Sequence, residues 1–575
     1  MNNMHTNTSK AKPSPVARLI SLLKPERADL GVIVFFSVLT GLLYLATPLA
    51  VDAVVQNIAF GGQQHVYVQT LMIFSVTLLL FLGLLSLVSV AQHFVAELIQ
   101  QRIFARLAGD LAYRLPRVRM SEYEGFKTQE LVNRFLDVTT IQKSSAYILL
   151  DGVNAILSTC IGLLVLAFYH PFLLGFDFFL VITLLVVLFP LGRNGVKTSI
   201  QESYAKHSVA GWFEQMVMFP MLFRNRAGKK VSLDKANGLV DDYLTQRKAH
   251  YRVLIRQILG LFTLQAIASA SLLAMGGSLV LQGELTLGQL VASELIVSAI
   301  VYSLVGLSKH IEVWYDALAA IDKHGSLVDL KIERQSGKTV SLPEAAYSVN
   351  VEDLSFAFSP NRPLFEGLNL EVKAGEQLGL TGVQGSGTGT LLQLIYGLHE
   401  YKEGLMEING IDLRYGHLDT VRDRIVYLHS VELFEGTIEE NVRMGREDIS
   451  IEELISAMKQ VGLDNLLKQD AQGLDRPIQL GGRPLSEGQR LRLCVARALL
   501  AKPRLVLIDK LMDGMDPVDS QHLMECILAD KGECTLIIAS RDPHILARCD
   551  RVLEIKEEGQ LEKVDYSMPK ASKKS

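Results

Sequence analysis

Residues 377–396 read QLGLTGVQGSGTGTLLQLIY, and this stretch decides the fold of the second half of the chain. Residues 377–380 predict a strand, 382–390 form a glycine-rich loop, and 391–396 predict a helix. In such an arrangement the glycines let backbone N–H groups cradle phosphates at the start of the helix. A glycine loop alone also occurs in ordinary turns. The candidate phosphate-binding residues are Gly382, Gly385, Ser386, Gly387, Thr388, Gly389 and Thr390.

A polar motif and two apolar runs follow this loop in the sequence. Residues 485–490, LSEGQR, lead into a helical run, and 505–509, LVLID, predict a buried strand that ends in Asp509. Residues 535–539 predict another buried strand. From Tyr347 onward, short β-rich runs alternate with helices, which indicates an α/β domain.

Long apolar runs dominate the first half of the chain. Apolar residues make up 49% of the sequence, and the mean hydropathy is +0.24. A membrane-spanning helix needs roughly 20 apolar residues. Six runs in series argue against buried helices of a soluble core and favour an all-α six-helix transmembrane domain. The predicted spans are 30–51, 66–96, 152–169, 172–192, 257–283 and 285–308.

The sequence is therefore that of a multi-domain chain whose boundaries follow changes in composition. The predicted order is a cytoplasmic N-terminal segment at 1–28, the transmembrane domain at 29–325, a linker at 326–345, the α/β domain at 346–563 and a basic tail at 564–575.

Two carboxylates interrupt the predicted spans. Asp177 lies close to a turn, which favours a side chain that reaches toward lipid headgroups over a polar point on a substrate path. Glu294 lies deeper, and two roles stay open for it: a similar interfacial position or a polar point on a substrate path.

The distribution of Lys and Arg predicts the orientation. Five precede the first span, eight lie in 97–146 and twelve lie in 193–256, whereas 52–65, 168–171 and 283–287 contain none. Basic residues are enriched in cytoplasmic connections. We expect a multi-pass protein of the cell inner (plasma) membrane, embedded in the lipid bilayer, with both termini in the cytoplasm.

The two long basic connections are expected to form helices that extend the spans at 102–113 and 240–256. Each connection is also expected to contain a short helix that touches a cytosolic domain, at 120–126 and at 209–218.

Charge and cysteine content exclude other classes. The net charge is only −4, so no nucleic-acid partner is implied. The five cysteines include no C-x-x-C pair, so neither a disulfide framework nor a zinc site is indicated.

The order of these motifs resembles that of ABC transporters over roughly residues 15–563. Residues 485–489 resemble the LSGGQ signature of the family, and 505–509 resemble its Walker B strand. Residues 283–290, GELTLGQL, resemble the turn into the last span of bacterial ABC exporters. The resemblance implies an exporter half, in which the membrane domain is fused to a P-loop NTPase-like nucleotide-binding domain.

The resemblance also implies cofactors, partners and site residues. The cofactors are ATP and Mg²⁺, with Asp509 as a weak metal ligand and Phe358 stacked on adenine. Two such halves pair head to tail, so the signature residues Ser486, Gly488 and Gln489 act on the ATP of the partner, and Asp516 belongs to the D-loop. The exported substrate stays unknown.

The catalytic positions depart from the family pattern. Thr388 stands at the Walker A lysine, and Gly389 stands at the Ser or Thr that binds Mg²⁺. His429 stands at the Q-loop glutamine, Lys510 at the general base and Ser540 at the switch histidine. Loss of a positioned base alone typically costs about 10²–10⁴ in rate. We therefore expect this nucleotide-binding domain to be degenerate, with no intact catalytic residue, and nucleotide binding to its own Walker face to be weakened.

The signature is better preserved, since only Glu487 departs from it. This asymmetry favours the non-catalytic half of a heterodimeric exporter whose partner supplies ATP hydrolysis. Two alternatives stay open: a membrane scaffold or regulator that transports nothing and carries a pseudo-ATPase domain, and an ordinary homodimeric ATPase exporter.

Overall fold

The computed structural model describes residues 13–60, 64–124, 134–338, 343–359, 362–469, 472–528, 532–556 and 559–566. The chain divides into two compact units. The helical unit comprises Met1–Val118 and Glu122–Lys331, and the α/β unit comprises Arg119–Ser121 and Ile332–Ser575. Residues 1–12 of the predicted N-terminal segment, 339–342 of the linker and 567–575 of the tail lie outside the described residues, as do short stretches of the two predicted domains.

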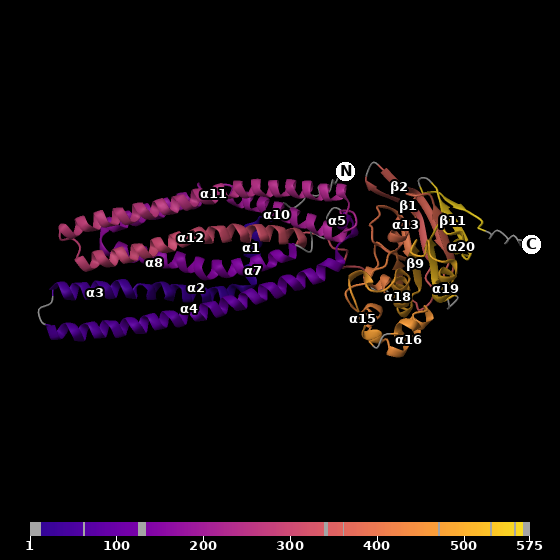
Figure 1. The fold of residues 1–575 in the computed structure, drawn as a ribbon, viewed down its shortest axis with the longest axis horizontal. Coiled ribbons are helices and arrows are strands. Elements are labelled where there is room, and N and C mark those ends of the chain that lie inside the picture. The colour runs from indigo at the N-terminus through magenta and orange to yellow at the C-terminus, as the bar shows by residue number, and fades with distance from the viewer. Residues whose placement is uncertain are drawn as a thin grey trace, which may run out of the picture. The chain divides into compact units, whose positions relative to one another are not determined.

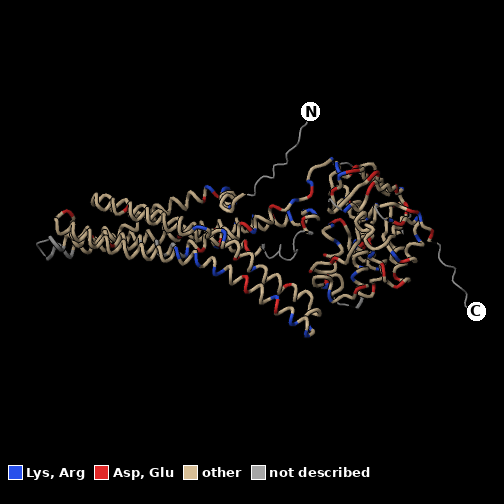
Figure 2. Tube along the Cα trace, turned by 90° about the horizontal axis from the view of Figure 1, so that it is seen from above, with Lys and Arg blue, Asp and Glu red and all other residues tan. Residues whose placement is uncertain are grey.

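The helical unit consists of long helices that run alongside one another (Figure 1). Charged residues are sparse along much of this bundle and gather toward one end of it (Figure 2). The helices are α1 (Pro15–Leu23), α2 (Arg27–Tyr44), α3 (Ala46–Phe60), α4 (Gln64–Arg114), α5 (Met120–Glu124), α7 (Asp137–Tyr147), α8 (Val153–Tyr169), α9 (Pro171–Leu188), α10 (Gly195–Met218), α11 (Arg226–Leu281) and α12 (Leu287–Val328).

Five candidate spans are found among the described residues. They are Pro15–Asn57, Gln69–Arg117, Asp137–Tyr169, Pro171–Leu188 and Arg226–Leu281. The sixth predicted span, 285–308, lies on α12, of which the stretch Leu287–Ile300 is apolar. Five of the six predicted spans thus coincide with candidate spans, and the sixth stays a prediction.

The first predicted span, 30–51, is not one regular helix. Helix α2 ends at Tyr44, and α3 begins at Ala46. Pro48 explains the break, because proline lacks an N–H and its ring clashes with the carbonyl four residues earlier, which is that of Tyr44. The N–H of Leu45 bonds instead to the carbonyl of Leu42, at 3.2 Å.

The helical extensions of the spans were predicted with mixed success. Helices α4 and α11 contain the predicted segments 102–113 and 240–256. The short helix predicted at 209–218 is wrong, because α10 continues to Met218 without a break. The other short helix is present as α5, and positions 125 and 126 of that prediction lie outside the described residues.

The interpretation of Asp177 is wrong. Its side chain is buried, and both carboxylate oxygens have no hydrogen-bond partner among the described residues. Asp177 shares a helix face with Leu173, Phe176 and Leu180, which belong to an apolar core together with residues of α8 and α11. The position of Asp177 along the span can be read from the sequence, but the direction in which its side chain points around the helix cannot.

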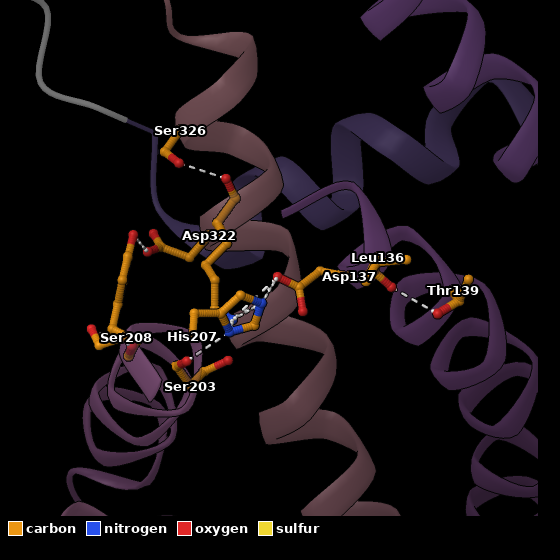
Figure 3. A network of polar contacts seen from close by, with 10 residues as sticks. Leu136, Asp137, Thr139, Ser203, His207, Ser208, Asp322 and Ser326 are labelled. Carbon is orange, nitrogen blue, oxygen red and sulfur yellow. Dashed lines mark hydrogen bonds and ion pairs between the residues drawn. The ribbon is translucent and has the colours of Figure 1, made fainter. Parts of the chain in front are cut away.

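A buried charge network joins α7, α10 and α12 (Figure 3). Lys323 on α12 is fully buried, and its Nζ lies 3.1 Å from Asp137 Oδ2 and 2.7 Å from His207 Nδ1. His207 Nε2 lies 3.4 Å from the same Asp137 oxygen. Burial, and then the charge of Lys323, lower the pKa of His207 below its ordinary value. Three helices are thereby held together by charges that have little access to water.

The α/β unit contains two main sheets. The strands are β1 (Val349–Ser359), β2 (Arg362–Val372), β3 (Gln377–Gly382), β4 (Glu403–Ile408), β5 (Ile411–Asp412), β6 (Ile425–Leu428), β7 (Gly436–Thr437), β8 (Pro477–Ile478), β9 (Leu505–Asp509), β10 (Thr535–Ala539), β11 (Arg551–Ile555) and β12 (Leu561–Lys563). An antiparallel sheet has the order β2-β1-β4-β5, and the central sheet has the order β12-β11-β3-β10-β9-β6. Strands β11, β3, β10, β9 and β6 are parallel.

Helices complete the α/β unit. They are α13 (Thr388–Ile395), α14 (Leu418–Arg422), α15 (Ile438–Arg443), α16 (Ile451–Gln460), α17 (Asp464–Gln469), α18 (Glu487–Leu500), α19 (Pro517–Ile527) and α20 (Pro543–Leu546). The strands predicted at 505–509 and 535–539 are confirmed as β9 and β10. Helix α12 runs to Val328 and therefore into the predicted linker, since it contains no proline.

Candidate nucleotide site

The candidate site lies at one edge of the central sheet. Strands β3, β10, β9 and β6 are neighbours and point the same way, so their carboxyl ends meet. The glycine loop follows β3, Ser540 follows β10, Lys510 follows β9 and His429 follows β6. The structure thus brings together the predicted Walker A, Walker B, Q-loop and switch positions. This is the edge at which open α/β sheets bind their ligands.

Positive backbone φ angles shape the phosphate loop. Gly385 and Gly387 have φ of 92° and 93°, a region that favours glycine. A Cβ atom on Gly387 would also lie 2.7 Å from the ring of Phe365. Gly387 precedes α13, so the free N–H groups of the first turn of that helix face the loop. The buried Oγ of Ser386 has no partner among the described residues, and a phosphate oxygen would satisfy it.

Thr388 occupies the lysine position at the start of α13. Its side chain is buried, with 6% of its surface exposed. A short neutral group in this place cannot extend to the β- and γ-phosphates as a lysine does. The loop therefore has the shape for phosphates but lacks their usual cation at this position.

The metal position is closed by Asp509. A Cβ atom on Gly389 would lie only 2.4 Å from Asp509 Oδ2. The carboxylate thus fills the space that a serine or threonine side chain would need. Asp509 Oδ1 is buried without a partner among the described residues, and burial raises the pKa of Asp509 above its ordinary value.

Mg²⁺ demands near-octahedral oxygen ligands and is usually bound by one or two protein groups together with substrate phosphates. Asp509 is the carboxylate available for it at this edge, and Gly389 offers no side-chain oxygen. These residues fit nucleotide phosphates better than they fit a metal ion.

The ring of His429 is held by stacking on a neighbouring ring. The glutamine expected at this position would instead have a side-chain amide. The His429 ring lies on the ring of Tyr427, with centroids 5.0 Å apart and planes inclined by 4°. His429 Nε2 lies 3.4 Å from Glu432 Oε1. Burial, and then the charge of Asp509, raise the pKa of Tyr427. Tyr427 was not predicted from the sequence, because nothing in an apolar strand distinguishes a tyrosine beside the Walker B carboxylate.

Lys510 and Ser540 are the residues at the positions predicted for the base and the switch histidine. Lys510 has φ of 54°, and its N–H donates to the carbonyl of Ala539 at 2.9 Å. Ser540 Oγ donates to Asp513 Oδ1 at 2.5 Å and accepts from the N–H of Asp542 at 3.0 Å. The hydroxyl is therefore committed to neighbours within the chain. Asp513 is a second residue that the sequence did not reveal, since its role depends on a loop contact.

The signature lies at the start of a different helix. Ser486 precedes α18, and its Oγ accepts from the N–H of Gln489, while Gln489 Oε1 accepts from the N–H of Ser486. This capping box fixes the local backbone. A Cβ atom on Gly488 would meet nothing within 4 Å, so the backbone there is open to approach. Helix α18 packs on α15, α16 and α19.

Glu487 occupies the first turn of α18 and is exposed. A carboxylate in this place is favoured by the helix dipole but competes with an incoming anion. The nearby Asp516 caps α19, because its Oδ1 accepts from the N–H of Val518 at 2.9 Å.

Phe358 is exposed enough to stack on a base. Its side chain is 55% exposed, and its ring meets Phe356 and His399 edge to face, at 5.0 and 5.4 Å. These neighbours support one side of the ring. His399 lies far from Phe358 in the sequence and could not be linked to it before the structure was known.

Comparisons with known proteins agree with this arrangement. The family model "ABC transporter" matches residues 365–512, and "ABC transporter transmembrane region" matches 30–210. An ATP-dependent permease MDL1 of Candida albicans is 25% identical over 97% of this chain and 86% of its own length. A multidrug efflux ATP-binding/permease protein of Mycobacterium tuberculosis is 29% identical over 53% of this chain. The matched region makes up 25% of the length of that relative.

The fold also resembles the structure of a bacterial Atm1-family ABC exporter with ATP bound. The TM-score is 0.81 at 20% identity, with 94% of this chain and 95% of the other covered. A transmembrane region precedes an ABC ATPase domain in the same order as in that exporter. The chain therefore belongs to the ABC transporters, as an exporter half in which a transmembrane domain is fused to a nucleotide-binding domain.

Proposed function

We propose that this chain is the non-catalytic half of a heterodimeric ABC exporter of the plasma membrane. A partner half with an intact Walker face binds and hydrolyses ATP against the Ser486–Gly488–Gln489 signature of this chain. Its own Walker face binds nucleotide weakly and does not hydrolyse it. Both termini lie in the cytoplasm, as the distribution of Lys and Arg favours.

One contrast carries this proposal. At the Walker edge the altered residues are accommodated by the surrounding structure, since Asp509 fills the space beside Gly389 and Ser540 is bonded to Asp513. At the signature, the capping box is complete and Gly488 is open. A chain that keeps only the face used in trans is suited to a catalytically intact partner.

The test is ATP hydrolysis by this chain alone, by a candidate partner alone and by the co-purified pair. The candidate partner is an adjacent reading frame that encodes a similar half with a G-x-x-G-x-G-K-[ST] loop and a glutamate after Walker B. We expect full activity only in the pair, and we expect Ser486→Ala in this chain to reduce it.

Ser450→Ala is the matched control. Ser450 caps α16 through the same kind of capping box, with Glu453 as its partner, and lies outside the signature. Loss of an N-cap typically costs about 0.5–2 kcal/mol in either place. Equal effects of the two substitutions on hydrolysis would show that Ser486 acts only through helix stability, which would contradict the proposal.

A second candidate function is a homodimeric membrane scaffold that transports nothing. The exposed carboxylate of Glu487 in the signature favours it, because this charge opposes a γ-phosphate. A scaffold predicts no partner that co-purifies and no hydrolysis in any combination. Hydrolysis by this chain alone that is abolished by Asp509→Ala would instead support an ordinary homodimeric exporter.

A further inference from the structure

The helical unit encloses a cavity of about 660 Å³ between α2, α3, α4, α8 and α12. This volume is within the usual range for small-molecule sites, about 300–1,000 Å³. More than half of its lining residues carry a hydrogen-bonding side chain. Polar groups within a membrane bundle are costly and commonly mark substrate paths.

Buried polar contacts form the middle of the cavity wall. Gln92 on α4 is 1% exposed, and its amide donates to Ser37 Oγ at 3.0 Å and to Asn154 Oδ1 at 3.1 Å. Asn154 donates in return to Gln92 Oε1 at 3.2 Å. Thr40, 2% exposed, also lines the cavity, and its Oγ1 has no partner among the described residues. This hydroxyl is available to a bound molecule.

A π-helical turn supplies the acidic end. Residues Ile148–Gly152 form this turn between α7 and α8, and it carries Asp151. Such turns are rare and occur frequently at functional sites. Asp151, Asn154 and Ser158 then follow one face of the helix into the cavity. His310 of α12 lies at the same end, because its ring is 6.4 Å from that of Tyr147, one turn before Asp151.

The opposite end is apolar. A Cβ atom on Gly162 would lie 3.0 and 3.3 Å from Ile300 and Ile296, so α8 and α12 are close there. Leu45 and Pro48 line the same region. The described lining residues include no Lys or Arg, and Asp151 is their one carboxylate. The cavity therefore has an acidic end and an apolar end.

We propose that this cavity binds an amphipathic organic cation, with its charged group at Asp151 and its apolar part toward Ile296 and Ile300. The inference rests on the proposed export function and names the substrate class that the helical unit accepts. An anionic molecule of the same size would meet the carboxylate of Asp151 and no Lys or Arg among the described lining residues.

Cysteine protection in the purified full-length chain tests the proposal. Ser158→Cys, in a chain whose native cysteines are replaced by alanine, places a thiol in the cavity, and methyl methanethiosulfonate reports its accessibility. The native Cys160, kept as the single thiol in a matched chain, is exposed on α8 but does not line the cavity. The probes are tetraphenylphosphonium and tetraphenylborate, which carry the same four phenyl groups and opposite charges.

We expect tetraphenylphosphonium to slow modification of the thiol at 158 but not of Cys160, and tetraphenylborate to protect neither. Asp151→Asn should raise the half-protecting concentration of tetraphenylphosphonium about tenfold, as expected for a lost ion pair of intermediate screening. Asp241→Asn, which removes an exposed carboxylate from the cytosolic part of α11, should leave it unchanged.

Equal protection by both probes, protection that is insensitive to Asp151→Asn, or a thiol at 158 that does not react at all would each overturn the proposal. ATP hydrolysis by the co-purified pair, measured on the same chains, separates the two hypotheses. Hydrolysis that still depends on Ser486, without cation protection, would refute the cavity assignment alone.

Discussion

Gly389→Ser restores the residue type that binds Mg²⁺ in the family, and the structure predicts that it destabilises the protein. The new Cβ would lie 2.4 Å from Asp509 Oδ2 and 3.1 Å from Asp509 Cγ. An ordinary van der Waals contact begins at 3.4 Å, so the carboxylate must move by 1.0 Å or the helix start must shift. Overpacking of this kind typically costs about 1–3 kcal/mol.

Calorimetric unfolding of the full-length chain measures this cost. Each kcal/mol shifts the melting temperature of a domain of this size by about 2–4 °C, so the loss should be about 2–12 °C. Tryptophan fluorescence is unsuitable, because Trp212 and Trp314 both lie in the helical unit. Gly488→Ser is the matched control, since its Cβ would meet nothing within 4 Å, and it should be close to neutral.

A double substitution identifies the cause. In a chain that already carries Asp509→Ala, the obstacle is absent, so Gly389→Ser should cost much less than it does alone. The reasoning would be refuted if Gly389→Ser were as mild as Gly488→Ser, or if Asp509→Ala left its cost unchanged.

Three further outcomes are expected. Asp137→Asn leaves the fully buried Lys323 without its carboxylate partner, and the loss of such a partner typically costs about 3–5 kcal/mol of the free energy of unfolding. Calorimetric unfolding would show a smaller loss if the charges were solvated. Because the pKa of His207 is lowered in the folded chain, the unfolded chain takes up a proton at this residue first as the pH falls. Stability should therefore decrease below about pH 6.5, and His207→Gln should weaken this pH dependence in a series of unfolding measurements. Glu487→Gly should lower the KM of the pair for ATP, and it should cost α18 about 0.3–1 kcal/mol of stabilisation by the helix dipole. An unchanged KM would contradict the repulsion between the Glu487 carboxylate and the ATP phosphates.

The parts of the fold that follow from local periodicity were predictable. Strand β9 is apolar from Leu505 to Ile508 and β10 from Leu536 to Ala539, as a parallel sheet buried on both faces requires. The glycine loop between β3 and α13 was predictable because positive φ angles demand glycine there. These signals lie within a few neighbouring residues.

Features that depend on direction around a helix or on distant neighbours could not be predicted. Asp177 faces an apolar core because of how α9 packs, and its spacing alone could not show that. The π-helical turn that carries Asp151 has no marker in its sequence, ILLDG. Asp513 holds Ser540 through a contact between two loops.

ATP hydrolysis by the co-purified pair tests the central claim most directly, with Asp509→Ala and Ser486→Ala introduced into this chain one at a time. The account predicts that Asp509→Ala leaves hydrolysis nearly unchanged, because the Walker face of this chain is not the working site. It predicts that Ser486→Ala reduces hydrolysis beyond the effect of Ser450→Ala. Hydrolysis abolished by Asp509→Ala and unaffected by Ser486→Ala would contradict it.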